Sequence, residues 1–366
     1  MIDNLYIFLA TGGFWTTFVL SLVLAFGSTP HDKNLRNYNR AKYIMAFSYL
    51  LFTIFSMFIM TGRLQKLDLP SLKALILIFS AFQLFLFTYV SITLLNYKHL
   101  SIKLLIYQLI PVFILSLFSI LSNLLNWGEK IANIVFYSLL FFFVIALLTV
   151  TCFFFVQYRK YRKRVDNYFT GVGTDRLKWI HTSSLFLLIC GIIVTIATLT
   201  LPIPEVAGPF HIVVILFYIG YAVHFLNYKN IFNVMKPVLE EEEEEEEEKP
   251  VTSSSLTFSQ IERALERWEQ QKLFTNPKIT IATVASQIYT NRSYLSQYIN
   301  RSKQKTFNEW INGLRIDEAK RIMATNKNMT IEEVSEKTGY TDKSYFSKCF
   351  VRYVGMTTMQ WKDKHL

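Results

Sequence analysis

Two segments of the C-terminal third place the same kinds of hydrogen-bonding side chains at the same spacing. The segments are ITIATVASQIYTNRSYLSQYIN, at 279–300, and MTIEEVSEKTGYTDKSYFSKCF, at 329–350. Each is typical of a short helix, a turn and a second helix, and each second helix opens with a Ser-Tyr-apolar-Ser run. Hydroxyl, amide and basic groups on one helix face can donate to and accept from the base edges in a DNA major groove.

The helical repeat divides each second helix into an apolar and a polar face. Leu295 and Ile299 fall on the apolar face of the first, and Phe346 and Phe350 on that of the second. The residues predicted to project outward are polar: Arg292, Ser293, Ser296, Gln297 and Asn300, then Lys343, Ser344, Ser347 and Lys348. Any one of them taken singly is an ordinary solvated surface residue. As a set they can read bases, because Gln pairs bidentately with adenine and Lys donates to guanine.

Local signals predict the elements that position these residues. Thr330 and Glu333 have the spacing of a capping box, Gly339 tolerates positive φ in the turn, and Asp342 suits an N-cap. The second unit carries one extra residue in its turn. Between the units, 307–325 predicts one longer helix. Its expected buried face contains Trp310, Leu314, Ala319 and Ile322.

Over about residues 257–362 the chain resembles the DNA-binding domain of the AraC/XylS family of bacterial transcription regulators. Two signatures carry the resemblance: WINGLRIDEAKRIM and IEEVSEKTGYTDKSYFSKCFVRYVGMTTMQW. The chain has Tyr340 where the family usually has Phe, and Gly355–Thr358 lacks the usual Pro. The end of the first recognition helix, 298–301, also departs from the family pattern.

The resemblance implies an all-α domain with two helix-turn-helix units, 279–301 and 329–352, that engage successive major-groove segments about 34 Å apart. It implies base-edge or adjacent positions for Ser293, Ser296, Gln297, Lys343, Ser344, Ser347 and Lys348. Phosphate contacts are expected for Arg301, Lys303, Lys305 and Arg352. Residues 249–366 hold 19 basic and 11 acidic residues, a net charge of +8 that favours a polyanionic partner.

The first two-thirds of the chain has a different composition. A bilayer core about 30 Å thick needs roughly 20 apolar residues in a helix. Seven apolar runs predict a transmembrane bundle: 5–26, 43–60, 74–95, 104–125, 134–156, 183–201 and 210–226. Residues 1–239 hold only 19 basic and 7 acidic residues, which excludes a single soluble globular fold. The 32 Phe and 20 Tyr exclude a disordered chain.

The charges of the loops predict the orientation of this bundle. With the N-terminus outside, 13 Lys and Arg lie in inside loops and 4 in outside loops. We therefore expect a multi-pass inner-membrane protein with its C-terminal domain in the cytoplasm. The outer loops are too short to hold a folded sensor, so the signal is read within the membrane, at its surface or from a partner protein.

Few polar residues lie within the spans. Gln83, His211 and His224 are candidates for function, although histidines near the ends of a span more often lie at the interface. The cysteines and histidines have no metal-ligand spacing, so we expect no metal and no cofactor. The linker 237–256 contains nine Glu at 240–248, which are either a solvated spacer or an acidic decoy for the basic domain.

These features predict an all-α protein: a seven-helix transmembrane domain (1–236), an acidic linker (237–256) and an AraC-type DNA-binding domain (257–366). The leading hypothesis is a non-enzymatic, one-component sensor that couples a membrane signal to sequence-specific promoter binding. The alternatives are a latent factor released by proteolysis near the linker, a transporter or membrane enzyme with a regulatory tail, and a tail that binds only proteins. Expected partners are double-stranded DNA, membrane lipids, a second copy of the chain and an unidentified membrane ligand or protein.

Overall fold

The computed structural model describes residues 2–28, 35–62, 69–95, 102–125, 127–170, 178–200, 209–228 and 258–365. Within these ranges the chain is helical, with one isolated β-bridge, so the predicted all-α class is confirmed. The chain divides into two compact units. One contains Met1–Arg159 and Trp179–Lys236, and the other contains Lys160–Lys178 and Pro237–Leu366. The predicted linker and its Glu run lie outside the described residues.

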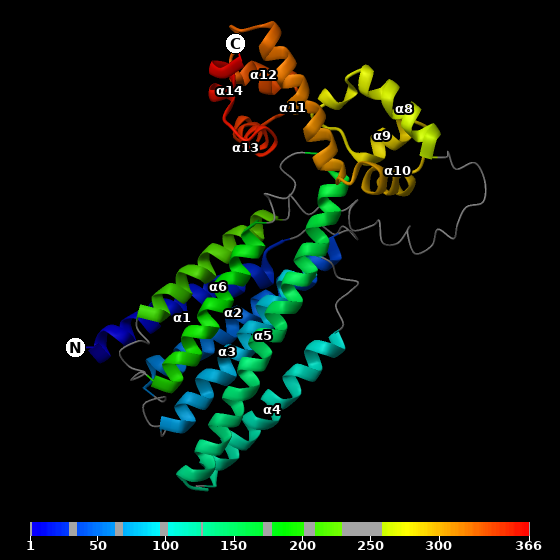
Figure 1. Cartoon of the computed structure of the whole chain (residues 1–366). Coiled ribbons are helices and arrows are strands. Elements are labelled where there is room, and N and C mark those ends of the chain that lie inside the picture. The colour runs from blue at the N-terminus through cyan, green and yellow to red at the C-terminus, as the bar shows by residue number, and fades with distance from the viewer. Residues whose placement is uncertain are drawn as a thin grey trace. The chain divides into compact units, whose positions relative to one another are not determined.

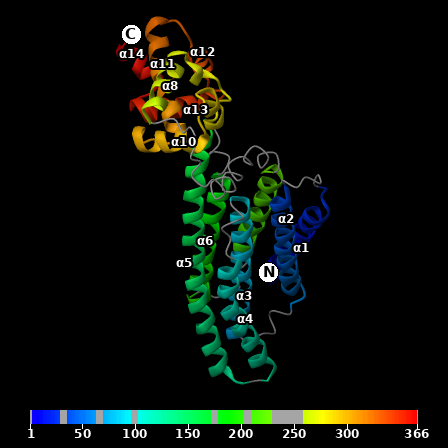
Figure 2. The same ribbon diagram turned by 90° about the vertical axis from the view of Figure 1, so that its right-hand side faces the viewer.

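The first unit is a bundle of long apolar helices (Figures 1 and 2). They are α1 Ile2–Phe26, α2 Arg36–Met60, α3 Leu69–Leu95, α4 Ile102–Leu124, α5 Glu129–Tyr168, α6 Lys178–Thr200 and a further helix, Pro209–Tyr228. Each predicted span falls on one of them. Six are long and apolar enough to cross a membrane, and α4, which contains Pro111, has a shorter described apolar stretch, Ile110–Ser119.

The bundle exposes apolar side chains and pairs polar ones between its helices. Large hydrophobic residues such as Phe141 and Leu148 are more than half exposed, as expected for a surface that faces lipid. Inside, the Thr17 and Thr53 hydroxyls lie 2.8 Å apart, and Ser48 Oγ donates to Gln83 Oε1 at 2.5 Å. Such interhelical hydrogen bonds contribute to helix association in a medium without water. Gln83 therefore has a structural role in this bundle.

Helix α5 is longer than the sequence predicts. The expected span 134–156 was to be followed by a loop that carries the basic residues of 159–164. The structure instead has one 40-residue helix, Glu129–Tyr168, which is about 60 Å long at 1.5 Å per residue. The loop is wrong because this segment contains neither Gly nor Pro and the basic residues are good helix formers. The last part of α5, from Lys160, belongs to the second unit.

The second unit is built around one central helix, α11, which spans Phe307–Thr325 with both ends as predicted. The other elements are α8 Phe258–Gln270, η4 Leu273–Thr275, α9 Ile281–Gln287, α10 Arg292–Tyr298, a π-helical turn η5 Ile299–Lys303, α12 Ile331–Lys337, α13 Lys343–Val354 and α14 Thr358–His365. On the predicted inner face of α11, Trp310, Ala319 and Ile322 are buried, whereas Leu314 is half-buried.

Candidate nucleic-acid interface

The second compact unit contains two shorter helix-turn-helix units, α9–α10 and α12–α13, which have the same backbone arrangement. In the first, Thr290 N donates to Ala285 O at 2.9 Å, and in the second, Tyr340 N donates to Ser335 O at 3.0 Å. The first helix has seven residues in both units. The second helix begins one residue later in the second unit, as the sequence alignment predicts. Both units are therefore helix-turn-helix structures of the same design.

Hydrogen bonds from side chains fix where the helices begin. The predicted capping box of Thr330 and Glu333 is confirmed, and Asp342 accepts from two backbone amides at the start of α13. A backbone hydrogen bond from Thr330 holds the pKa of the Glu333 carboxyl below its ordinary value. The first unit has a capping box that the sequence pattern missed, in which Thr280 pairs with the Thr283 hydroxyl.

The turns of both helix-turn-helix units contain a residue with positive φ, but the residue type differs. Gly339 adopts φ +86°, as predicted, and the equivalent Tyr289 adopts φ +58°. A Cβ atom at Gly339 would lie 2.2 Å from the carbonyl oxygen of Thr275, so only glycine fits there. Tyr289 is 91% exposed, so its left-handed conformation is strained but its side chain is not crowded.

The second recognition helix, α13, presents its predicted face to solvent. Lys343, Ser344 and Lys348 are exposed, and Ser347 is half-buried, with its hydroxyl donating to Lys343 O at 3.0 Å. On the opposite face Phe346 and Phe350 are fully buried, as predicted. The outward set of α13 therefore lies on one accessible surface.

The first recognition helix, α10, is less accessible. Leu295 and Ile299 are buried as predicted, and Gln297 is exposed. The other four residues of its outward set are half-buried: Arg292, Ser293, Ser296 and Asn300. Part of the face that was predicted to be open is therefore covered within the unit.

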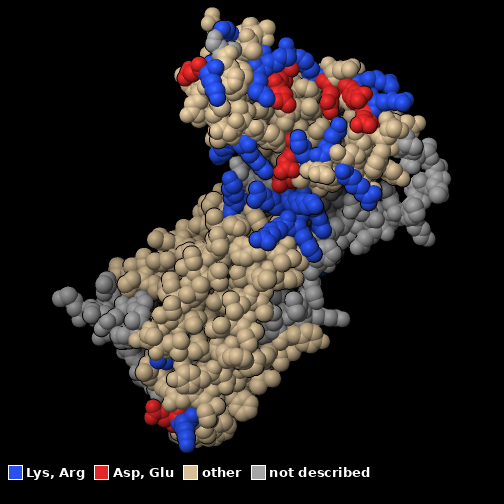
Figure 3. Space-filling view, viewed as in Figure 1, with Lys and Arg blue, Asp and Glu red and all other residues tan. Residues whose placement is uncertain are grey.

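The predicted phosphate-contacting residues lie at the edges of these helices. Arg301, Lys303 and Lys305 are exposed in and after η5. Arg352, on α13, pairs with Glu309 at 3.2 Å and remains mostly exposed. Exposed ion pairs of this kind contribute little, about 0–1 kcal/mol, so a phosphate group can replace the carboxylate. Figure 3 shows Lys and Arg gathered on this unit and at the end of α5, whereas the visible face of the bundle carries few.

One buried arginine connects the two helix-turn-helix units, and sequence reasoning missed it. Arg315, on α11, is 1% exposed. Its Nε donates to Phe274 O at 2.8 Å and an Nη donates to Asn276 O at 2.7 Å, just before the first unit. Its guanidinium lies 5.3 Å from the ring centroid of Tyr340, in the second unit. Burial lowers the pKa of Arg315.

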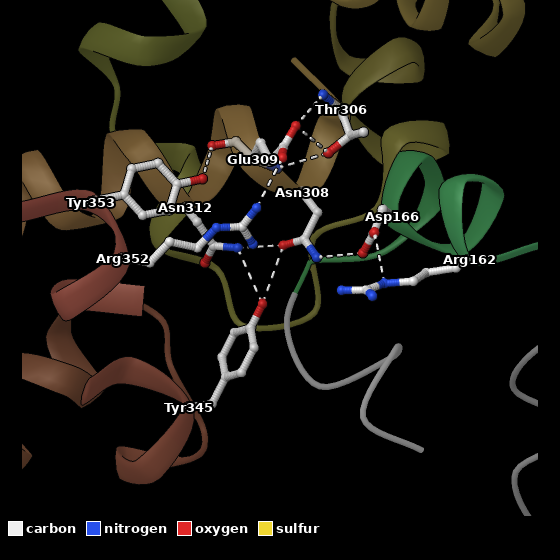
Figure 4. A network of polar contacts seen from close by, with 9 residues as sticks. All are labelled: Arg162, Asp166, Thr306, Asn308, Glu309, Asn312, Tyr345, Arg352 and Tyr353. Carbon is white, nitrogen blue, oxygen red and sulfur yellow. Dashed lines mark hydrogen bonds and ion pairs between the residues drawn. The ribbon is translucent and has the colours of Figure 1, made fainter. Parts of the chain in front are cut away.

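A second missed feature is a polar network that links α5, α11 and α13 (Figure 4). Asn308, which is buried on α11, donates through Nδ2 to Asp166 Oδ1 at 3.2 Å. Its Oδ1 accepts from Tyr345 on α13 at 3.4 Å and from Asn312. Asp166 also lies 3.9 Å from Arg162. Burial is the main cause that raises the pKa of the Asp166 carboxyl above its ordinary value.

The same face of α11 makes a second connection to α13 (Figure 4). Tyr353 donates its hydroxyl to Glu309 O at 2.7 Å, beside the Arg352 ion pair with the Glu309 carboxylate. That carboxylate also accepts from the Thr306 backbone amide and so caps α11. Side chains from α11 therefore fix where α13 lies.

Comparison with known proteins identifies the same part of the chain. A family profile described as a helix-turn-helix domain matches residues 284–364, from α9 to α14. The chain is 24% identical over 91 residues to an uncharacterised transcriptional regulatory protein, YesN, of Bacillus subtilis, across 24% of this chain and 25% of that protein. It is 30% identical over 84 residues to an uncharacterised HTH-type transcriptional regulator of Pseudoalteromonas carrageenovora, across 23% of this chain and 49% of that protein.

A third relative is larger. The chain is 25% identical over 118 residues to histidine kinase P4 of Formosa agariphila, across 31% of this chain and 8% of that protein. The chain thus matches less than half the length of each of these relatives. No solved structure matches it.

Proposed function

We propose that this chain, whose residues 284–364 form an AraC-type helix-turn-helix domain, is a membrane-bound regulator of transcription that binds specific sites in double-stranded DNA. One observation carries the proposal: the domain contains two helix-turn-helix units with the same backbone arrangement, and α13 exposes basic and hydroxyl side chains along one face. A recognition helix with such a face enters the major groove. Two units in one chain reach two successive groove segments.

In this proposal the outward residues divide into two groups by what they contact. Those on α10 and α13 face base edges, with Gln297 suited to adenine and Lys348 to guanine. Arg301, Lys303, Lys305 and Arg352 contact phosphates, which position the domain without reading sequence. The two groups make different predictions, because loss of a phosphate contact weakens binding to every sequence alike.

The membrane part of the proposal rests on the apolar helices and on loop charge. Six helices of sufficient length and apolar character, with large side chains exposed, support insertion in a bilayer. The excess of Lys and Arg in alternate loops favours an N-terminus outside and a DNA-binding domain in the cytoplasm. The bundle, its lipids or a partner protein then supplies the signal, and a second copy of the chain supplies a paired site.

The proposal is tested by selecting random duplex DNA with the full chain in nanodiscs, at a stated salt concentration. We expect enrichment of a bipartite motif with half-sites about one helical turn apart. Lys348→Ala is expected to relax one position of that motif. The matched variant Lys303→Ala is expected to weaken all sequences uniformly and to reduce the salt slope by about 1. Retention that depends on salt but enriches no motif would overturn sequence-specific binding.

A further inference from the structure

The end of α5 belongs to the C-terminal unit and pairs with the start of the first helix-turn-helix unit. Phe169 forms an antiparallel bridge with Thr280, the N-cap of α9. Next to it, Thr170 Oγ1 donates to Ile279 O at 3.0 Å. The two residues that follow α5 are thus hydrogen-bonded to residues 279–280, at the start of the first helix-turn-helix unit.

A second contact reaches the first recognition helix itself. The guanidinium carbon of Arg292, the first residue of α10, lies 5.8 Å from the ring centroid of Tyr168. Tyr168 is buried at 8% exposure. An arginine that is attracted to an aromatic face by its positive charge is not available to a phosphate or a base edge at the same time.

A third contact reaches both units through α11. Asp166 accepts from Asn308 at 3.2 Å, and the Asn308 carbonyl accepts from Tyr345 on α13 (Figure 4). Residues 166–170 therefore contact three places: α11, the first residue of α10 and the segment just before α9. Two of these places lie in the first helix-turn-helix unit, whose recognition face is half-buried, whereas the outward set of α13 is mostly exposed.

We propose that residues 160–170 occupy a surface of the first helix-turn-helix unit in competition with DNA, so that docking of the α5 end lowers DNA affinity and its release raises it. This inference rests on the proposed function, because it describes how that DNA site is controlled. α5 has no Gly or Pro between Glu129 and Tyr168, so a shift of its apolar part is transmitted along the helix. Shifts of about 1–2 Å are common in such switches and exceed the tolerance of a hydrogen bond.

A cysteine pair at the bridge tests the docking and the competition together. Opposed residues of an antiparallel pair have Cα atoms about 4.5–5.5 Å apart, within the range of a disulfide. In the full chain in nanodiscs, Phe169→Cys with Thr280→Cys is expected to form a disulfide under mild oxidation. The selected DNA duplex is expected to slow that reaction at least threefold, while a scrambled duplex leaves it unchanged. Thr280→Cys alone is the control for loss of the cap.

The cross-linked chain supplies the second measurement. We expect the oxidised double variant to bind the selected duplex at least tenfold more weakly than the same protein after reduction. The oxidised and reduced forms of the single variant are expected to bind equally.

Alanine variants at the contact test the same idea without a cross-link. Tyr168→Ala and Asp166→Ala are each expected to raise the affinity of the full chain for the selected duplex about threefold to tenfold. Tyr137→Ala, which removes an exposed tyrosine from the apolar part of α5, is the matched control and should change nothing. If Tyr168 acts through Arg292, its effect is lost in an Arg292→Ala background.

The outcomes separate the inference from the proposed function. Failure of the disulfide to form, or equal DNA affinity of the locked and reduced chains, overturns the inference and leaves the proposed function standing. A cross-linking rate that ignores the selected duplex does the same. Absence of selective DNA binding in the parent chain, the reduced variant and the alanine variants overturns the proposed function, and the inference falls with it.

Discussion

The two helix-turn-helix units share a backbone but differ in their surroundings. The second has a glycine turn, a twelve-residue recognition helix and an open outer face. The first has a tyrosine in its turn, a seven-residue recognition helix followed by a π-helical turn, and a half-buried outer face next to α5. The same backbone arrangement thus carries one mostly exposed outer face and one half-buried one. Under the proposed docking of residues 160–170, DNA binding is controlled at the first helix-turn-helix unit.

Removing the arginine between the units is the most severe way to break this comparison. Arg315→Ala removes a donor from the buried carbonyl of Phe274 and one of the two donors to the Asn276 carbonyl, and it opens a cavity, so we expect a loss of about 4 kcal/mol in unfolding free energy. Hydrogen exchange of α9 and α12 amides in the full chain measures it. Arg321→Ala, at an exposed position on the same helix, should change stability far less than Arg315→Ala. Equal effects of the two variants would contradict the role of Arg315.

The turns offer the next largest effect. Gly339→Ala forces an alanine into positive φ and against the Thr275 carbonyl, so we expect a loss of about 3 kcal/mol. Tyr289→Gly relieves strain at the equivalent position, and its expected effect is a gain below about 1 kcal/mol. Thermal unfolding of the C-terminal unit within the full chain distinguishes the two signs. A gain in stability for Gly339→Ala would show that the two turns are not equivalent.

DNA affinity sharpens the contrast between the recognition helices. Lys348→Ala on α13 is expected to cost about 1–3 kcal/mol in specific binding. That cost should be the same in the parent chain and in Tyr168→Ala, because Tyr168 contacts Arg292 on α10, whereas Lys348 is already exposed. Gln297→Ala, on the covered helix, should cost more in the Tyr168→Ala background than in the parent. Titration of the selected duplex at fixed salt supplies the four affinities.

The two capping boxes predict the smallest difference, which depends on pH. Thr330→Ala and Thr280→Ala are each expected to cost about 1 kcal/mol at pH 7. Only the second box contains a carboxyl. The folded-state pKa of Glu333 lies below its ordinary value of 4.5, so the stability it contributes is present above that value and is lost as pH falls through the folded-state pKa.

Melting temperatures of the two variants and the parent at pH 7 and in acid provide the comparison. The effect of Thr330→Ala should shrink on acidification, and that of Thr280→Ala should not, because its partner is the uncharged Thr283. A parallel loss in both variants would argue against Glu333 as the source.

The sequence predicts what local chemistry determines. Thr330, Glu333 and Asp342 predict where helices begin, because a cap depends only on neighbours within three residues. The strict apolar spacing of α10 and α13 likewise predicts Leu295 and Phe346 as core. The apolar runs predict the bundle because a bilayer demands one length and one composition of every span.

Long-range contacts explain what the sequence did not predict. No local pattern predicts the burial of Arg315, because arginine is almost never fully buried and its acceptors lie about 40 positions away in the chain. The basic residues after the fifth span read as a loop because charge marks the membrane boundary but does not end a helix. The pairing of Asp166 with Asn308 has no local pattern at all.

Helix α5 contributes residues to both compact units, so its last residues are synthesised before their partners in the C-terminal unit. The contact between Asp166 and Asn308 joins residues 142 positions apart. At about 5–20 residues per second, the ribosome makes the second partner some 7–28 s after the first. Val165 and Tyr168, buried in the finished protein, meanwhile await partners that have not been translated. A chain that ends before Ile279 therefore lacks the residues that Tyr168, Phe169 and Thr170 contact in the finished unit.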